Sequence, residues 1–384
     1  MKVNLITLGR FHHFHLARQM QRFKILNLIY SGYPKLALKN EKDIPPQKII
    51  THPYFQLGVL FLKRYAQFLP DSFFYAFENF AHKNLTINAA NKIFDNNILI
   101  ASSSAGLEAG KITQSNGGYF FCDRGSPHIE SQNKILTDEY RRFKIPFTPI
   151  PKYMIERECE EYETADFISI PSNFAYKSFI KKGFSTKKLF LNPYGSDIQL
   201  FNSKNITSKK KFRVIFVGHV NINKGIIYLI KAFNKLNYTN KELIIVGDVE
   251  KLIKPIINKL LNNNIKFTGR LKNNILKKFY STSDVMVLPS LSDGMGLVIG
   301  EALACGCPVI ATQNSGAENY FTNNKEGFII PIRSSNHILD KLQLLIDNRY
   351  LRNKMSNAAS LSTKKKNGWD QYGDRWFKKI KSLK

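Results

Sequence analysis

The sequence predicts an α/β protein with two doubly wound domains, and three observations support this prediction. The chain has 384 residues, about two to three times the length of a typical domain. Short apolar runs are followed repeatedly by amphipathic segments, which is typical of the strand–helix units of a parallel sheet. Residues 203–211 are polar, rich in lysine and without apolar periodicity, so we expect a linker there and a domain boundary near residue 200.

The first half of the chain has the pattern of one such domain. Residues 105–115 and 155–165 show helical periodicity and lie between short apolar runs. The strands that we expect in this half are Val3–Leu8, Ile98–Ser102, Tyr119–Cys122, Phe167–Ile170 and Leu189–Leu191. Residues 1–200 should therefore fold as the N-terminal domain.

The second half shows the same pattern more clearly. Each expected strand ends near Gly, Ser, Asp or Pro and is spaced from the next for a crossover helix. These strands are Val214–Val217, Leu243–Val246, Ile265–Thr268, Val285–Leu288 and Val309–Ala311. After a break at residues 364–368, residues 369–383 predict an amphipathic helix. We therefore expect a second domain over 201–365 and a terminal helix within 366–384 that packs back toward the first domain.

Composition and charge exclude some classes of protein and leave others open. With 43% hydrophobic residues the chain is too apolar for a disordered protein. Its net charge of +28 would attract nucleic acid, anionic lipid or phosphorylated small molecules, but lysine is abundant along the whole chain and charge alone identifies no partner. The four cysteines are too few and too scattered for a disulfide framework, and no apolar stretch reaches the length of about 20 residues that spans a bilayer. We expect a cytoplasmic protein, soluble or held peripherally at a membrane face.

The most informative segment is residues 289–311, which contains a glycine-rich turn between a strand and a short helix. This geometry turns unpaired N–H groups and the positive end of a helix dipole toward an anion. Gly294 and Gly296 lack a Cβ, so a ligand could approach the main chain around Met295 and Leu297 closely. A diphosphate fits such a site.

Two carboxylates bracket this predicted anion site. Asp293 precedes the turn, and Glu301 lies about one turn into the helix. A carboxylate can accept hydrogen bonds from vicinal hydroxyls, so Glu301 could hold a ribose while Asp293 meets a sugar hydroxyl. Alternatively, Asp293 caps the turn and Glu301 complements the helix N-terminus. The spacing alone leaves both interpretations open.

With its flanks, this segment resembles the retaining glycosyltransferases of family 4 (group 1), whose pattern is Pro-Ser-x-x-Glu-Gly-Phe-Gly-Leu-x-x-x-Glu-Ala-x-Ala-x-Gly-x-Pro-Val-Ile. Two positions depart from it: Asp293 stands where Glu is usual, and Met295 where an aromatic residue is usual. Asp is one methylene shorter than Glu, so its reach to the donor sugar differs. We expect this to affect which sugar is bound more than the reaction itself. The positions in register are Pro289, Ser290, Gly294, Gly296, Leu297, Glu301, Ala302, Ala304, Gly306, Pro308, Val309 and Ile310.

A second segment, residues 216–225, resembles the same family's Val-Gly-Arg-Leu-x-x-x-Lys-Gly element. Gly218 and Lys224 are in register, and the resemblance implies that Lys224 contacts the donor diphosphate and offsets charge on the leaving group. His219 replaces the usual Arg, so a permanently charged bidentate contact becomes a titratable one. Without this register, Lys224 would be interpreted as a solvated lysine.

The N-terminal half has two candidate segments. In the first, Gly9 closes a strand and should face the donor phosphates or the acceptor. His12, His13 and His15 follow it; without an acidic or Cys partner nearby in the sequence, we expect these histidines to cap and pack the helix rather than to bind a metal.

The second candidate segment is residues 122–128. Many relatives carry a histidine near this strand end, beside the reacting sugar, and His128 is the candidate here, although it lies several residues later than usual. Asp123 and Arg124 could instead form a local ion pair. The acidic run at residues 156–163 is interpreted as the solvated face of a helix.

The resemblance implies the GT-B architecture, two Rossmann-like domains that face each other across a crevice. It further implies retaining transfer of a sugar from a nucleotide diphosphate sugar to a glycan or lipid-linked glycan acceptor, as in cell-surface polysaccharide or lipopolysaccharide synthesis. The N-terminal domain would bind the acceptor and the second domain the donor, with no cofactor and no metal at the donor site. The catalytic candidates are Asp293, Lys224 and His128.

Two alternatives remain at this stage. A nucleotide-sugar epimerase would share the fold but would turn over the donor without any acceptor. A nucleic-acid-binding protein is suggested only by the charge, and residues 177–190 are the nearest candidate for a basic stripe with stacking aromatics. We expect no nucleic-acid partner, and propose that part of the charge contacts an anionic membrane surface.

Overall fold

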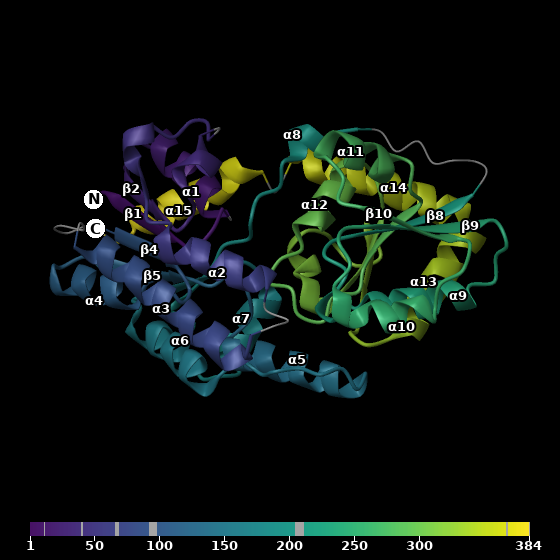
Figure 1. Ribbon diagram of the computed structural model, residues 1–384. Helices are drawn as coiled ribbons and strands as arrows, with labels where there is room; N and C mark the ends of the chain where they lie inside the picture. The colour runs from purple at the N-terminus through teal and green to yellow at the C-terminus, as the bar shows by residue number, and fades with distance from the viewer. Residues whose placement is uncertain are drawn as a thin grey trace.

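The computed structural model describes residues 1–10, 12–39, 41–65, 69–91, 98–203, 211–365 and 368–383. Within these residues the chain forms two all-parallel sheets, one in each half, with helices on their faces (Figure 1). The first sheet has seven strands in the order β3-β2-β1-β4-β5-β6-β7, and the second has six in the order β10-β9-β8-β11-β12-β13. The prediction of two Rossmann-like domains is confirmed.

The N-terminal domain alternates strands and helices from the start of the chain. Its strands are β1 (Val3–Thr7), β2 (Leu26–Ser31), β3 (Ile49–Thr51), β4 (Ile98–Ser102), β5 (Tyr119–Asp123), β6 (Phe167–Ile170) and β7 (Leu189–Leu191). Its helices are α1 (His12–Arg22), α2 (Tyr54–Arg64), α3 (Asp71–Ala90), α4 (Leu107–Ser115), α5 (Ile129–Arg142), α6 (Lys152–Thr164), α7 (Asn173–Ile180) and α8 (Ile198–Phe201).

The C-terminal domain repeats this alternation around the second sheet. Its strands are β8 (Phe212–Val217), β9 (Lys241–Val246), β10 (Ile265–Gly269), β11 (Val285–Leu288), β12 (Val309–Thr312) and β13 (Gly327–Ile330). The longer helices are α9 (Ile226–Lys235), α10 (Lys254–Asn258), α11 (Asn273–Ser281), α12 (Leu297–Ala304), α13 (Ser335–Asp347), α14 (Arg349–Lys365) and α15 (Trp369–Lys381). The expected linker falls mostly on residues 204–210, which lie outside the described residues.

All ten strands expected from the sequence are present, and three more were missed. Strand β3 is a half-buried edge strand of three residues, too short to be distinguished from a loop by its pattern. Strand β2 follows α1 after only a few residues, so its apolar run merges with that of the helix. Strand β13 is four residues long. In contrast, all residues of β1 and β9 are buried, because helices cover both faces of a parallel sheet.

In both sheets the strand order reverses at one point, and the predicted site segments lie at these two points. In each sheet the first strand of the domain is an interior strand, third in the order, so the order reverses between β1 and β4 and between β8 and β11. Connections leave the carboxyl ends of these neighbouring strands in opposite directions and open a crevice between them. The predicted segments that follow β1, β8 and β11 therefore all lie at such edges.

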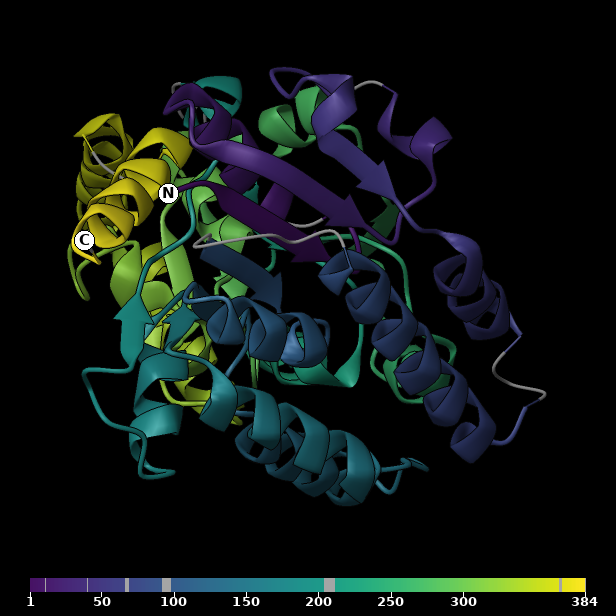
Figure 2. The ribbon, with the colours of Figure 1, turned by 90° about the vertical axis from the view of Figure 1, so that its left-hand side faces the viewer.

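The chain returns to the N-terminal domain at its end. Figures 1 and 2 show the yellow C-terminal helix beside the purple N-terminal segment, and α15 packs against α1. The Phe23 and Phe377 rings stack with centroids 4.0 Å apart, and Trp376 is fully buried. None of the described helices combines the length and hydropathy needed to cross a bilayer.

Candidate functional site

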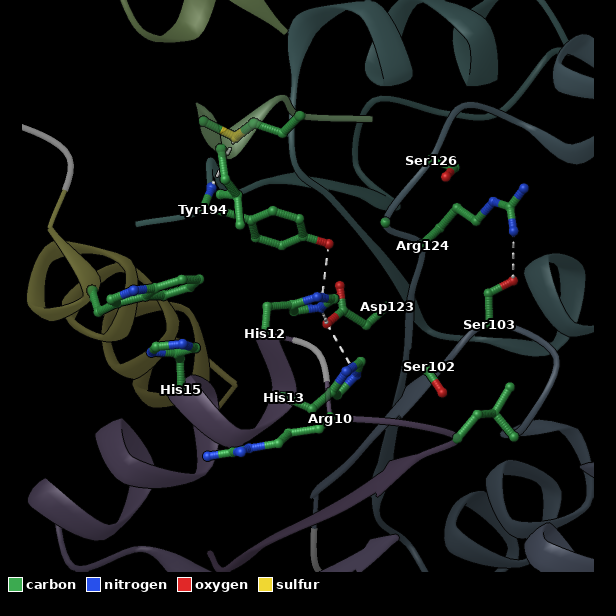
Figure 3. A pocket seen from close by; sticks show the side chains of 15 residues that line it. Arg10, His12, His13, His15, Ser102, Ser103, Asp123, Arg124, Ser126 and Tyr194 are labelled. Atoms are coloured by element: carbon green, nitrogen blue, oxygen red, sulfur yellow. Dashed lines mark hydrogen bonds and ion pairs between the residues drawn. The ribbon is translucent and has the colours of Figure 1, made fainter. Parts of the chain in front are cut away.

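A cavity of about 610 Å³ lies between the two domains. Its N-terminal side is formed by the carboxyl ends of β1, β4 and β5 and by the start of α1 (Figure 3). Met295 and Leu297 of the glycine-rich segment line it from the C-terminal domain, and Trp369 of α15 lines it beside His15 of α1. The cavity thus joins three segments that are far apart in the sequence.

At the base of this cavity His12 and Asp123 form a close pair. His12 Nε2 lies 2.7 Å from Asp123 Oδ2, and His13 Nε2 lies 3.3 Å from the same oxygen. Burial alone would raise the pKa of the Asp123 carboxyl, but His12, His13 and a hydrogen bond from Ser169 together hold that pKa below its usual value. The Tyr194 ring stacks on His12, with its hydroxyl 3.2 Å from His12 Nε2.

The expected ion pair between Asp123 and Arg124 is wrong, because these residues point to different partners. Arg124 pairs with Glu158 of α6 at 2.9 Å, while Asp123 turns toward the histidines of α1. Glu158 and Glu161 are buried, so the interpretation of residues 156–163 as a solvated face is also wrong for these two positions. Helix α6 turns these two glutamates inward, and Glu161 accepts hydrogen bonds from the Ser104 and Gly106 amides.

On the C-terminal side, two of the predicted residues meet directly. The Lys224 ammonium forms an ion pair with Asp293, and both side chains are largely buried. The two loops that carry them are joined by hydrogen bonds from Asn223 Nδ2 to the Ser292 carbonyl, 2.9 Å, and from the Leu291 amide to the Asn223 carbonyl, 2.8 Å. The segments recognised separately in the sequence therefore form one unit at the β8–β11 edge.

The glycine-rich turn differs in detail from the expectation. The Gly296 amide donates to the Ser315 carbonyl at 2.9 Å, so it is not free for an anion. Among the described residues, the Leu297 and Val298 amides at the start of α12 have no hydrogen-bond acceptor. Free N–H groups at a helix start can bind an anion, and these two, rather than that of Gly296, are available for it.

Position 294 requires a glycine because the main chain of the N-terminal domain lies against it. A Cβ at this position would lie 1.8 Å from the Gly125 carbonyl oxygen of the N-terminal domain. The expectation that a ligand approaches here is therefore corrected, because the space over Gly294 is filled by the other domain. The neighbouring Met295 accepts a hydrogen bond on its sulfur from the Tyr194 amide.

Glu301 is the fifth residue of α12, on the side that faces Tyr280. The Tyr280 hydroxyl donates to Glu301 Oε2 at 3.1 Å. Burial raises the pKa of Glu301 to about 7, against the opposing effect of this hydrogen bond. Glu301 and the ion pair of Lys224 with Asp293 do not line the 610 Å³ cavity themselves, whereas Met295 and Leu297 between them do.

The other predicted residues lie as follows. Gly9 is buried at the end of β1, next to the lining residues Leu8 and Arg10. Gly218 has a φ of 148° at the end of β8, and His219 after it is exposed.

His128 is not part of the cavity. It is the N-cap of α5, where its ring accepts from the Glu130 amide, and it packs among Tyr162, Phe179 and Phe184. Burial lowers the pKa of His128 to about 4. At the strand end where a histidine was sought, the structure places Asp123 beside His12. The sequence offered no local signal for this pair, because 111 positions separate its members.

The C-terminal half matches a known protein family. Residues 197–361 match the family model described as glycosyl transferases group 1. The sulfoquinovosyl transferase of Arabidopsis thaliana is 28% identical over 224 residues, 53% of this chain and 42% of that protein. The alpha-monoglucosyldiacylglycerol synthase of Acholeplasma laidlawii is 25% identical over 206 residues, 52% of this chain and 48% of that protein. The chain thus spans about half the length of the curated relatives it matches.

Solved structures are similar over the whole chain. HepE of Anabaena in complex with UDP superposes with a TM-score of 0.70, 17% identity and 100% of both chains covered. The sucrose-phosphate synthase of Thermosynechococcus elongatus gives 0.71, 16% identity, and 100% and 99% coverage of this chain and of that chain. The predicted GT-B architecture is confirmed by this likeness.

Proposed function

We propose that this protein is a retaining glycosyltransferase that moves a sugar from a nucleotide diphosphate sugar to a glycan or lipid-linked glycan acceptor. The observation that supports it most is the joining of Lys224 and Asp293 at the β8–β11 edge, within the residues that match group 1 glycosyltransferases. The sequence segments that carry these two residues resemble that family independently. HepE, with the same fold, was crystallised with UDP.

The donor would lie along the start of α12. Glu301 would accept hydrogen bonds from the ribose hydroxyls, and the Leu297 and Val298 amides with Lys224 would hold the diphosphate. Asp293 would orient the sugar and, through its ion pair, the Lys224 ammonium. As the glycosidic bond breaks, negative charge grows on the leaving phosphate, and the ammonium and the helix N-terminus would stabilise it.

We also propose that the donor diphosphate needs no metal ion. The Lys224 ammonium and the two free amides at the start of α12 would donate hydrogen bonds to the diphosphate in place of a divalent ion. The acceptor would enter the cavity from the N-terminal side. The contact between Gly294 and Gly125 closes the two domains over it, which would exclude water and favour transfer over hydrolysis.

The acceptor is proposed to be lipid-linked and met at an anionic membrane surface. Helices α2 and α3 expose large apolar side chains, among them Tyr54 at 74% and Phe61 at 63%. The net charge of +28 adds electrostatic attraction. Sedimentation with anionic and with neutral vesicles tests this: Phe61→Glu should weaken binding to anionic vesicles, and Tyr350→Glu, at the more exposed Tyr350 of α14, should not. Indifference of the wild type to anionic lipid would refute the membrane proposal.

A nucleic-acid-binding function is not supported by the segment suggested for it. Phe179 is buried and Phe184 packs against the ring of His128, so the aromatics of residues 177–190 are not arranged to stack on bases. The epimerase alternative is separated by a simple assay, because an epimerase would convert the donor sugar with no acceptor present.

The central test begins with the donor. Thermal shift with a panel of nucleotide sugars should identify one that stabilises the protein, and transfer to lipid-linked glycans is then measured with that donor. Asp293→Asn and Glu301→Gln should abolish or strongly reduce transfer, while Lys235→Met, an exposed lysine at the end of α9, should leave it unchanged. Transfer at the wild-type rate by both active-site variants would refute the donor-site assignment.

A further inference from the structure

Three potential metal ligands meet at the base of the cavity, and the proposed transfer gives none of them a role. His12 and His13 begin α1, and Asp123 ends β5 at the carboxyl edge of the same sheet. Their ligand atoms all lie within 4.8 Å of one another (Figure 3). The acidic partner that the sequence lacked near the histidines is thus supplied by the fold.

The His13 side chain is a second observation that points to a ligand at this cluster. It is fully buried, yet neither ring nitrogen makes a hydrogen bond to any of the described residues. A buried imidazole without a hydrogen-bond partner is uncommon, because its nitrogens lose their hydrogen bonds to water on folding and form none with the protein. The Asp123 oxygen near it is 3.3 Å away but not aligned for a hydrogen bond.

We propose that His12, His13 and Asp123 bind one divalent transition-metal ion, with Zn²⁺ as the preferred ion and a fourth position open to the cavity. Two imidazoles and a carboxylate are a common three-ligand set for zinc, and imidazole disfavours Mg²⁺ and Ca²⁺. Bonds of about 2.0–2.2 Å in a tetrahedral site put ligand atoms about 3.3 Å apart. His13 and Asp123 already have this separation, 3.3 Å.

The His12 side chain has to adjust when an ion binds, because its ligand atom is placed only within 4.8 Å of that of His13. Its Nε2 lies 2.7 Å from Asp123 Oδ2, a hydrogen-bond distance that must widen by about half an ångström when a metal replaces the shared proton. The 12% exposed His12 side chain lies at the cavity wall, where this movement is possible. The Tyr194 hydroxyl lies 3.2 Å from the same nitrogen.

The site is separate from the donor diphosphate site and its occupancy can be measured without any donor. All three ligands belong to the N-terminal domain, whereas Lys224 and Asp293 belong to the other domain. An ion here would leave its open position facing the part of the cavity where a hydroxyl group of a substrate could coordinate. The metal proposal can therefore be refuted without refuting the proposed transferase activity, and the reverse is also true.

The test is metal binding by the full chain, without an affinity tag. Protein treated with a chelator is dialysed against Zn²⁺ and its metal content measured; a second sample is titrated with Co²⁺ and followed by visible absorption. We expect one Zn²⁺ per chain and tetrahedral Co²⁺ bands that Zn²⁺ removes. His13→Gln and Asp123→Asn should lower the affinity at least tenfold, in the range that loss of one ligand gives.

His15→Gln is the matched control. His15 lies on the same helix and lines the same cavity, but it stacks on Trp369 and is not one of the three ligands. Circular dichroism checks folding, and if His13→Gln or Asp123→Asn does not fold, His12→Asn at the less buried position replaces it. The proposal is overturned if the wild type binds less than a tenth of an equivalent at micromolar Zn²⁺, if folded ligand variants bind like the wild type, or if His15→Gln loses as much affinity as they do.

Discussion

A single methyl group added at position 294 should hold the two domains apart. A Cβ on Gly294 would lie 1.8 Å from the Gly125 carbonyl oxygen and 2.9 Å from the Ser126 Cα. Both are main-chain atoms of the other domain, so no side chain can rotate to make room. The φ angle of Gly294 is not in the positive region, so alanine is acceptable to its own backbone and the clash is the only cost.

The size of the effect follows from this geometry. The gap must widen from 1.8 Å to the 3.4 Å at which ordinary contact begins, a displacement of about 1.6 Å. Misplacement of reacting groups by about 1 Å can cost about 100-fold in rate. Gly294→Ala should therefore lower kcat by about 100-fold or more. The donor Kd should change by less than about threefold, because Lys224, Glu301 and the Leu297 and Val298 amides, which we propose to hold the donor, all lie in the second domain.

The assay is steady-state transfer with the donor found by thermal shift, together with donor binding by calorimetry. Ser292→Ala is the control in the same loop, since the Ser292 hydroxyl makes no hydrogen bond to the described residues and its removal leaves the main chain unchanged. A folded Gly294→Ala protein with kcat within threefold of the wild type would show that the contact between Gly294 and Gly125 is not needed in the active state.

Three further predictions follow from buried charges. Lys224→Met should lower kcat by about 100- to 1000-fold, while Lys224→Arg should restore part of it, because the charge on the leaving phosphate is then still offset; equal rates for both variants would contradict this. Burial raises the pKa of Glu161 to about 8, so its neutral form is favoured in the folded state. The free energy of unfolding should therefore fall as pH rises from about 4.5 to 8, by up to about 1.4 kcal/mol per pH unit from this group. Urea titrations of Glu161→Gln should show a flatter profile than the wild type. Arg333 donates at 2.6 Å to Glu139, fully buried on α5, across the domain interface. Arg333→Ala should thus destabilise the protein by about 3 kcal/mol, as breaking a buried pair does, and an unchanged denaturation midpoint would refute this.

The sequence by itself determined the parts of this protein that depend on neighbouring residues. Burial on both faces of a parallel sheet requires continuous apolar runs, so β8 and β11 could be located from such runs in the sequence alone. The turn from Ser290 to Leu297 and the segment ending at Lys224 were recognised because the residues that shape a turn or a helix start lie within a few positions of one another. From the register of these two segments, Lys224 and Asp293 were both assigned to the donor site, and the fold joins them.

Only the tertiary structure decided the partners of residues that are distant in the chain. Asp123 meets His12 across 111 positions because β1 and β5 lie on either side of β4 and α1 begins over their carboxyl edge. Arg124 turns to Glu158 because α6 packs against the same edge, which buries a charge that the local pattern places in solvent. Gly294 is glycine because another domain's backbone occupies the space of its Cβ. Such contacts depend on how layers pack, and no local pattern of residues records which element will face which.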